Sequence, residues 1–293
     1  MKGTIIENIS NLYRLADEDG KIYEANARGK FKQEEIIPVV GDKVDFTKLE
    51  EGKAVIEEIY PRKLYIKRPK MANITQLIFV VSSNDPKPDL LMLDKSLAFA
   101  EFIKTKTIIV LNKIDLDKKS EFEQIKNIYE KIGYKIIETN AKKGFGIDLL
   151  KDELKNNISA FSGNSGVGKS TLINSIFKTN ITQEGEISKR NKRGKNTTTS
   201  TKLYEIEKNS YIADTPGFST FDISEIESRN LAKYFKEFKK EIERCEFIDC
   251  THIKEEECGI KKALTLGKIS QDRYDRFCKI YHELKEREDN KRW

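Results

Sequence analysis

The chain has few of the residues that mark secreted and membrane proteins. Its 293 residues include four cysteines, three of which lie close together, so a metal site explains them better than a disulfide framework. No stretch reaches the ~18 consecutive apolar residues of a membrane-spanning helix. The N-terminal apolar run meets a charge at Glu7, too early for a signal peptide. We therefore expect a cytoplasmic protein without a membrane partner.

Neither sign of charge dominates strongly. Lysine and arginine number 54 against 48 aspartate and glutamate, which gives a net charge of +6 and a pI of about 8.8. This excess permits a polyanionic partner but does not require one. A hydrophobic content of 38% is enough for buried cores, and the length suggests two or three domains.

Short alternating runs separated by turn residues fill residues 1–66. Five such runs, at 4–9, 12–16, 21–27, 44–47 and 54–59, predict an all-β domain. Five strands in this length suit a closed barrel of the oligonucleotide-binding (OB) type. The strand pattern alone fits another small barrel, used for protein contact, equally well.

The sequence pattern of the remaining residues predicts two further domains. Residues 67–221 alternate short apolar runs, mostly unbroken by charge, with helical stretches at 89–103, 118–132, 147–156 and 169–177, which is the pattern of a doubly wound α/β domain. Residues 222–293 are polar, with helical periodicity over 225–243 and 268–291 on either side of the cysteine cluster. We expect this last region to be a mostly α zinc-binding domain.

A phosphate-binding loop is the clearest motif. The sequence G-x-x-x-x-G-K-S follows the apolar run 158–161 and opens a helix, which is the context that a P-loop needs. Backbone N–H groups of such a loop surround phosphates, Lys169 reaches the β- and γ-phosphates, and the Ser170 hydroxyl binds Mg²⁺. The expected nucleotide-binding residues here are Gly163, Asn164, Ser165, Gly166, Val167, Gly168, Lys169, Ser170 and Thr171.

The base-recognition motif N-K-x-D selects guanine over adenine. It begins at Asn112, directly after the apolar run 107–111. The carboxylate of Asp115 can accept hydrogen bonds from the N1–H and 2-amino groups of guanine, whereas adenine would leave that charge unpaired. Asn112 would brace the loop, and the stem of Lys113 would pack on the ring. A second, weaker base loop is expected at Asn140 and Ala141.

Two further motifs would complete a magnesium nucleotide site. Asp214 begins the sequence D-T-P-G and is expected near Mg²⁺, while the N–H of Gly217 can meet the γ-phosphate. A run of threonines at 197–199 supplies switch-loop hydroxyls. We assign Mg²⁺ to Ser170, Thr198 and Asp214, although the sequence does not decide which of the three threonines binds it.

The order of these motifs is rearranged. In ordinary small GTPases the P-loop comes first and the two base loops come last, but here the base loops at 112 and 140 precede the P-loop at 163. A parallel α/β sheet tolerates such a change because domain termini are often close together. The motif order thus predicts a circularly permuted P-loop GTPase domain.

The cysteine cluster has the ligands of a structural zinc site. Cys245, Cys250, His252 and Cys258 offer three thiolates and one imidazole, the set that closed tetrahedral zinc sites use. Cys278 and His282, one helical turn apart, are a competing ligand pair, or simply one face of a helix.

Together these features resemble one known family, the ribosome small-subunit-dependent GTPase A family of permuted bacterial GTPases. The motif order carries the resemblance, as do the cysteine cluster and the sequences at 38–42, 68–69, 194–199 and 214–218. The resemblance covers essentially the whole chain. It implies an OB barrel, a permuted GTPase domain with GTP or GDP and Mg²⁺, one zinc ion per chain, and the small ribosomal subunit with its rRNA as partner. We expect a monomer.

The catalytic machinery is sparse. Phe218 occupies the place where Ras-like enzymes carry a water-orienting glutamine, and Asn196 stands where the family often has histidine. Lys169 and Asn196 are therefore the expected catalytic residues, with no evident general base. A cluster of lysine and arginine over 189–195 either contacts RNA phosphates or is a solvated charge run. Two other functions fit parts of the pattern, namely a nucleic-acid-binding module without nucleotide turnover and a P-loop ATPase.

Overall fold

The computed structural model describes residues 1–9, 12–29, 31, 36–50, 52–67, 69–118, 120–178, 201–214 and 222–290, without the side chains of Lys178 and Asp214. The chain divides into two compact units. The first spans 1–78, 139–162 and 168–218, and the second spans 79–138, 163–167 and 219–293. No helix among the described residues is long and apolar enough to cross a membrane.

A closed five-stranded barrel begins the first unit. Its strands are β1 (Lys2–Ile9), β2 (Leu12–Asp17), β3 (Ile22–Ala27), β4 (Lys43–Lys48) and β5 (Lys53–Ile59). They follow the order β1-β2-β3-β5-β4, and β4 pairs back onto β1 to close the barrel. Alternate residues point inward, so that Ile5, Leu15, Ala25, Val44 and Ile56 are fully buried. The OB-type topology that the resemblance implied is confirmed.

Three more strands continue the sheet of the first unit. Strand β11 (Ile158–Ser162) pairs in parallel with β13 (Ser210–Asp214), and β13 pairs antiparallel with β12 (Lys202–Glu207). Strand β12 then pairs with barrel strand β1, in the register Glu7 to Lys202. Every residue of β11 is buried, as its sequence without charged residues predicts. Helices α4 (Ile147–Leu154) and α5 (Lys169–Lys178) belong to this unit.

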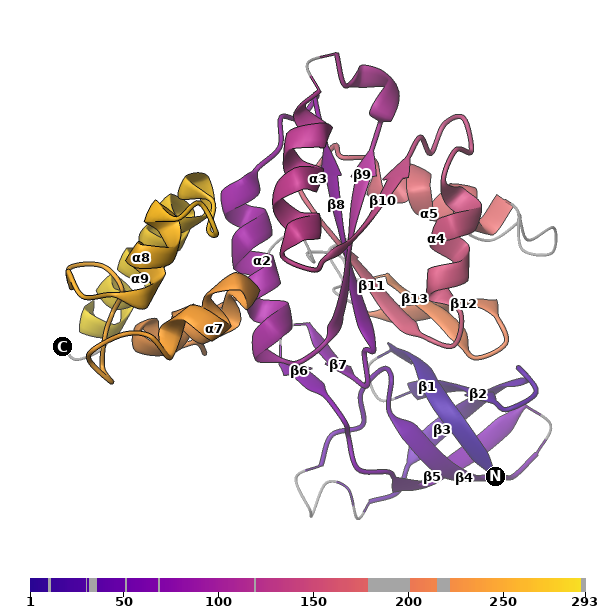
Figure 1. The fold of residues 1–293 in the computed structure, drawn as a ribbon. Coiled ribbons are helices and arrows are strands. Elements are labelled where there is room, and N and C mark those ends of the chain that lie inside the picture. Colours follow the sequence, from indigo (N-terminus) through magenta and orange to yellow (C-terminus); the bar gives the residue numbers. More distant parts are fainter. Residues whose placement is uncertain are drawn as a thin grey trace. The chain divides into compact units, whose positions relative to one another are not determined.

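The second unit contains the strands β8 (Gln76–Ser82), β9 (Lys106–Asn112) and β10 (Lys135–Thr139), in the order β10-β9-β8. The first residues of β8 lie in the other unit. Helices α2 (Leu90–Phe102) and α3 (Glu121–Lys131) accompany these strands. The C-terminal region packs along α2 (Figure 1) and consists of η2 (Ser228–Tyr234), η3 (Lys236–Phe238), α7 (Lys239–Ile242), α8 (Gly259–Thr265) and α9 (Gln271–Asn290).

Two expectations about elements need correction. The continuous helix expected over 225–243 is wrong, because this segment forms two 3₁₀ turns and a four-residue helix. It folds in short pieces so that Leu231, Phe235 and Phe238 can all reach the core against α9. A hairpin of β6 (Tyr65–Lys67) and β7 (Lys70–Ala72) was not expected at all.

Candidate nucleotide site and metal centre

The glycines of the P-loop meet a steric requirement. Gly163 follows β11 with φ of +142°, and a Cβ atom placed on it would lie 2.3 Å from the carbonyl oxygen of Val80. Gly166 and Gly168 also have positive φ, at +86° and +95°. Only glycine adopts these angles without strain, so the loop can bring its backbone N–H groups close to an anion.

The base-recognition loop is tied to the P-loop within the second unit. Asn112 is 2% exposed, and its Nδ2 donates to the carbonyl oxygen of Val167 at 2.9 Å. Lys113 has the left-handed φ of +63°, and its Nζ donates to the carbonyl oxygen of Asp85 at 2.5 Å. Asp115 lies on the short turn η1 (Ile114–Leu116) and is exposed, so its carboxylate is open to a base edge.

The second base loop belongs to the first unit. Asn140 and Ala141 follow β10 and are buried. The Asn140 side chain accepts the N–H of Lys143 at 3.2 Å, and the carbonyl of Ala141 accepts the hydroxyl of Ser175 on α5 at 2.7 Å. The loop is therefore held against the helix that Lys169 opens.

Lys169 stands at the start of α5 and is half-buried. Burial lowers the pKa of its ammonium group. Ser170 and Thr171 follow it and are exposed, while Asn164 is half-buried and Ser165 exposed in the loop before it. The backbone of Asp214 ends β13 opposite Lys202 of β12. The predicted site residues Asn196, Thr198 and Gly217, together with Phe218 and the basic cluster 189–195, lie outside the described residues.

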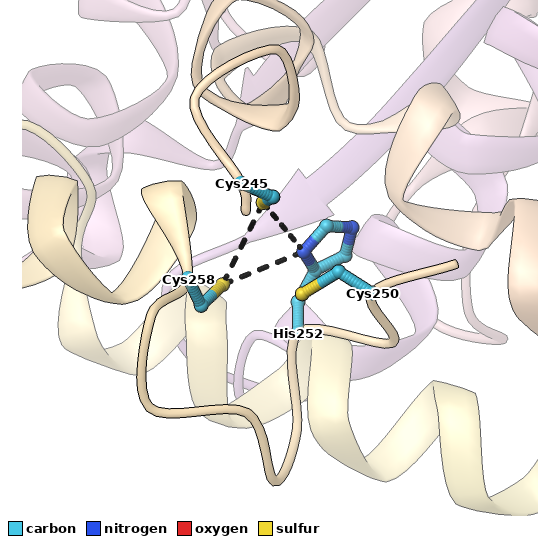
Figure 2. A group of neighbouring side chains, drawn as sticks. All are labelled: Cys245, Cys250, His252 and Cys258. Atoms are coloured by element: carbon cyan, nitrogen blue, oxygen red, sulfur yellow. Dashed lines mark hydrogen bonds between the residues drawn. The ribbon is translucent and has the colours of Figure 1, made fainter. Parts of the chain in front are cut away.

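The four predicted zinc ligands come together (Figure 2). Their ligand atoms all lie within 4.8 Å of one another. His252 Nδ1 is 3.5 Å from the sulfur atoms of both Cys245 and Cys258, and these sulfurs are 4.0 Å apart. A tetrahedral zinc ion, with bonds of about 2.3 Å to sulfur and about 2.0 Å to nitrogen, needs edges of about 3.8 Å and 3.5 Å. The cluster therefore fits zinc, and the competing pair Cys278 and His282 is not part of it.

Neighbouring groups hold the loops that carry these ligands. Tyr274 Oη on α9 donates to the carbonyl oxygen of His252 at 2.7 Å, and the N–H of Gly259 donates to Cys245 Sγ at 3.3 Å. The Glu255 carboxylate accepts three backbone N–H groups and one hydroxyl from the loop around it. Burial alone would raise the pKa of Glu255, but these hydrogen bonds hold it at about 2.

Burial also governs the protonation of the ligands themselves. Desolvation raises the pKa of Cys250 to about 12 and raises that of Cys258, while it lowers the pKa of His252. Without a cation the thiols would stay protonated, and a divalent ion at the centre would favour their thiolates. A neutral imidazole is the form of histidine that binds a metal.

Sequence reasoning missed several of these supporting residues. Tyr274 and Glu255 have no motif, because their roles arise only when α9 and the ligand loop pack together. The loop after β8 also gave no signal, although its Asp85 carbonyl holds Lys113 and Pro86 lies beside Gly166. A proline-rich stretch after a buried strand is the only hint that the sequence offered.

Comparisons with known proteins cover the whole chain. The profile of the RsgA GTPase family matches residues 59–224, and that of the RsgA N-terminal domain matches residues 2–56. The chain is 42% identical to the small ribosomal subunit biogenesis GTPase RsgA of Clostridium acetobutylicum, over 99% of this chain and 100% of the relative. It is 39% identical to that of Caldanaerobacter subterraneus, over 98% and 97%.

Solved structures agree. The crystal structure of YjeQ from Thermotoga maritima matches with a TM-score of 0.85 and 36% identity, over 97% of this chain and 98% of that one. The structure of YloQ, described as a circularly permuted GTPase, matches with a TM-score of 0.81 and 29% identity, over 98% and 95%. Because two RsgA profiles match residues 2–56 and 59–224 and full-length relatives are about 40% identical, the chain belongs to the RsgA GTPase family.

Proposed function

We propose that this GTPase acts in the maturation of the small ribosomal subunit and that the subunit stimulates its hydrolysis of GTP. The observation that carries the proposal is the end-to-end similarity to relatives named small ribosomal subunit biogenesis GTPase. The net charge of +6 agrees with an rRNA partner. We propose that the protein acts in the cytoplasm, where it would bind the small subunit as a monomer.

We propose the nucleotide roles below, and the geometry of the described loops supports them. We infer that Asp115 reads the guanine edge, because Asn112 is committed to the Val167 carbonyl while Asp115 stays exposed. The P-loop residues 163–171 would surround the phosphates, with Asn140 and Ala141 beside the base. Mg²⁺ would be held by Ser170, Thr198 and Asp214, and it would supply positive charge to the β- and γ-phosphates.

Catalysis would rest on positioning and charge. The Lys169 ammonium can neutralise charge that develops on the transferred phosphoryl group. Asn196 can orient a water molecule through its amide, but an amide cannot act as a base near neutral pH. We therefore propose that full turnover needs the subunit to order the segment around Asn196.

The Cys₃His cluster would hold one structural zinc ion. Its four ligands leave no open coordination position for a substrate, which is the arrangement of structural sites. We propose domain boundaries at 1–66, 67–221 and 222–293, which keep the barrel and the cluster in separate domains.

The decisive measurement is phosphate release from GTP with and without isolated small subunits, with large subunits as the control. We expect slow intrinsic hydrolysis, marked stimulation by small subunits, and none by large ones.

Two variants test the proposed catalytic residues in the same assay. Lys169→Ala should abolish turnover. Asn196→Ala should lower stimulated turnover more than GTP affinity. Full intrinsic turnover that subunits do not change would overturn the proposal, and binding without any turnover would favour the nucleic-acid-binding module.

A further inference from the structure

A cavity of about 570 Å³ lies in the first unit, at the end of the sheet away from the P-loop. One side is formed by the amino ends of β11 and β13, where Ile158 and Tyr211 begin their pairing. The other side is formed by barrel strands β1, β2 and β4. Its volume falls within the ~300–1,000 Å³ of typical small-molecule sites.

Three lysines line this cavity. Lys2, Lys43 and Lys63 all face it, and among the described residues none of them forms an ion pair. Lys43 is bound only through its Nζ, which donates to the hydroxyl of Thr4 at 2.8 Å. An ammonium group has three donors, so two of those on Lys43 remain for a ligand. Lys43 is exposed, and desolvation of its ammonium group lowers its pKa more than the nearby charge of Glu18 raises it.

The acidic residues on the wall do not cancel this charge. Asp17 also lines the cavity, but its Oδ1 accepts the backbone N–H groups of Asp19 and Lys21, at 3.0 and 2.8 Å. These hydrogen bonds fix the Asp17 carboxylate within its own turn but do not remove its charge. Asp17 and Glu18 together oppose three lysines on the wall, which leaves the lining with one net positive charge.

A buried phenol adds a further donor. Tyr211 is 4% exposed, lines the cavity, and makes no side-chain hydrogen bond with any described residue. Burial raises its pKa to about 12, so the hydroxyl stays protonated at neutral pH and can donate. Ile74, Ile158 and Pro61 supply apolar wall, and Tyr60 is held in place by Asp45 through a 2.7 Å hydrogen bond.

We propose that this cavity is a second ligand site, separate from the GTP site, for a phosphate ester the size of one nucleotide. Lysines and a hydroxyl donor suit a phosphate group, which accepts several charge-assisted hydrogen bonds at once. The apolar and aromatic walls suit an attached ring. One nucleotide of an RNA strand and a free nucleoside monophosphate share this chemistry.

The test uses the full chain saturated with GDP, so that the GTP site is filled. Cytidine 5′-monophosphate and single-stranded hexauridylate serve as probes, because neither base has the guanine edge proposed for Asp115. Binding is measured by calorimetry and by ligand-observed NMR, with cytidine as the probe without phosphate. We expect saturable binding of at least one phosphorylated probe and none of cytidine. Tighter binding of hexauridylate would identify RNA as the source, and equal binding would identify the free nucleotide.

Substitutions in and outside the cavity test whether the phosphorylated probes bind there. Lys43→Glu should weaken it by at least about tenfold, the effect of losing a hydrogen bond to a charged group. Lys48→Glu makes the same charge change on the same strand, at a position that is exposed like Lys43 but lies outside the cavity, and should have little effect. Tyr211→Phe keeps the ring and should weaken binding several-fold, which covers the case in which Lys43→Glu does not fold. GTP turnover should be unchanged in all three. No binding of either phosphorylated probe, or equal affinity in Lys43→Glu and Lys48→Glu, would overturn the proposal.

Discussion

Asp115 is the residue on which the proposed choice of guanine depends. Its carboxylate is exposed, whereas Asn112 is bonded to the Val167 carbonyl and Lys113 to that of Asp85. Asp115→Asn should weaken GTP binding by roughly 1–3 kcal/mol, because one acceptor becomes a donor. Binding of xanthosine triphosphate should improve. Competition with labelled GDP measures both, and Asp148→Asn, at an exposed position on α4, is the control. Unchanged GTP affinity would reject the assignment.

Gly163 is a residue where a single methyl group should be disruptive. The added Cβ would lie 2.3 Å from the Val80 carbonyl at a φ of +142°. Gly163→Ala should therefore displace the loop and sharply reduce GDP affinity, as measured by fluorescent-nucleotide titration. Gly29→Ala, where nothing lies within 4 Å of the new atom, should bind normally. Equal affinities would show that the loop tolerates the shift.

The sequence predicted individual site residues well where they belong to a contiguous motif. The four zinc ligands were predicted and lie together, because a short loop cannot carry them far apart. Tyr274 and Glu255 could not be predicted in the same way. Their contacts depend on how distant segments pack. The position of a tyrosine in a helix does not indicate, from sequence alone, that its hydroxyl will bond to a metal-binding loop.

Helices α2 and α9 are joined by buried charges. Asp94 on α2 is 1% exposed and is bonded to both Arg273 and Arg276 of α9 and to the hydroxyl of Tyr129. Arg273 is equally buried and also pairs with Glu237. Asp94 thus stands at the centre of an ionic network that ties the C-terminal region to α2.

Removing one member of such a network leaves a buried charge without its partner. Asp94→Ala should lower the free energy of unfolding by about 3–5 kcal/mol, as measured by urea denaturation followed by circular dichroism. Asp275→Ala, at an exposed position on α9, should cost far less. Similar losses in the two variants would mean that the network adds little stability.

The fold of the loop that carries the Cys₃His cluster should depend on bound zinc and on all four ligands. Cys250→Ser should bring bound zinc well below one per chain and expose the C-terminal region to proteolysis, while GDP still binds. Cys278→Ser is the matched control and should keep its zinc, because Cys278 lies outside the cluster. Elemental analysis of both purified variants measures the zinc bound per chain. Full zinc in Cys250→Ser would mean that the ligand set is different.

Elements were predictable where the pattern of hydrophobic residues agreed with the burial in the fold. Strand β11 matched its pattern because it is buried at every residue, as a strand inside a parallel sheet is, and helix α9 matched because its buried residues recur at helical spacing. The segment 225–243 has apolar residues at helical spacing, yet it forms short turns. Tertiary packing of Phe235 and Phe238 against Phe277 outweighed the local preference.

For the whole molecule, the order of the motifs was more informative than any one of them. The permutation could be recognised because each motif has its own residue signature, and the comparisons confirm it. The ribosomal partner could not be derived from physical chemistry. It entered through the resemblance alone, because a net charge of +6 is compatible with many polyanions.

The pairing of β1 with β12 has a consequence for solubility. Without the barrel, β12 would be the outer strand of β11-β13-β12, with unpaired N–H and C=O groups that invite another chain to add to the sheet. A chain that begins at residue 67 should therefore self-associate on size-exclusion chromatography with light scattering, whereas the full chain should stay monomeric. A monomeric, soluble fragment would show that the edge needs no cover. If the fragment self-associates instead, the barrel has a second purpose besides any ligand it binds, because it covers the edge of the GTPase sheet and prevents other chains from adding to it.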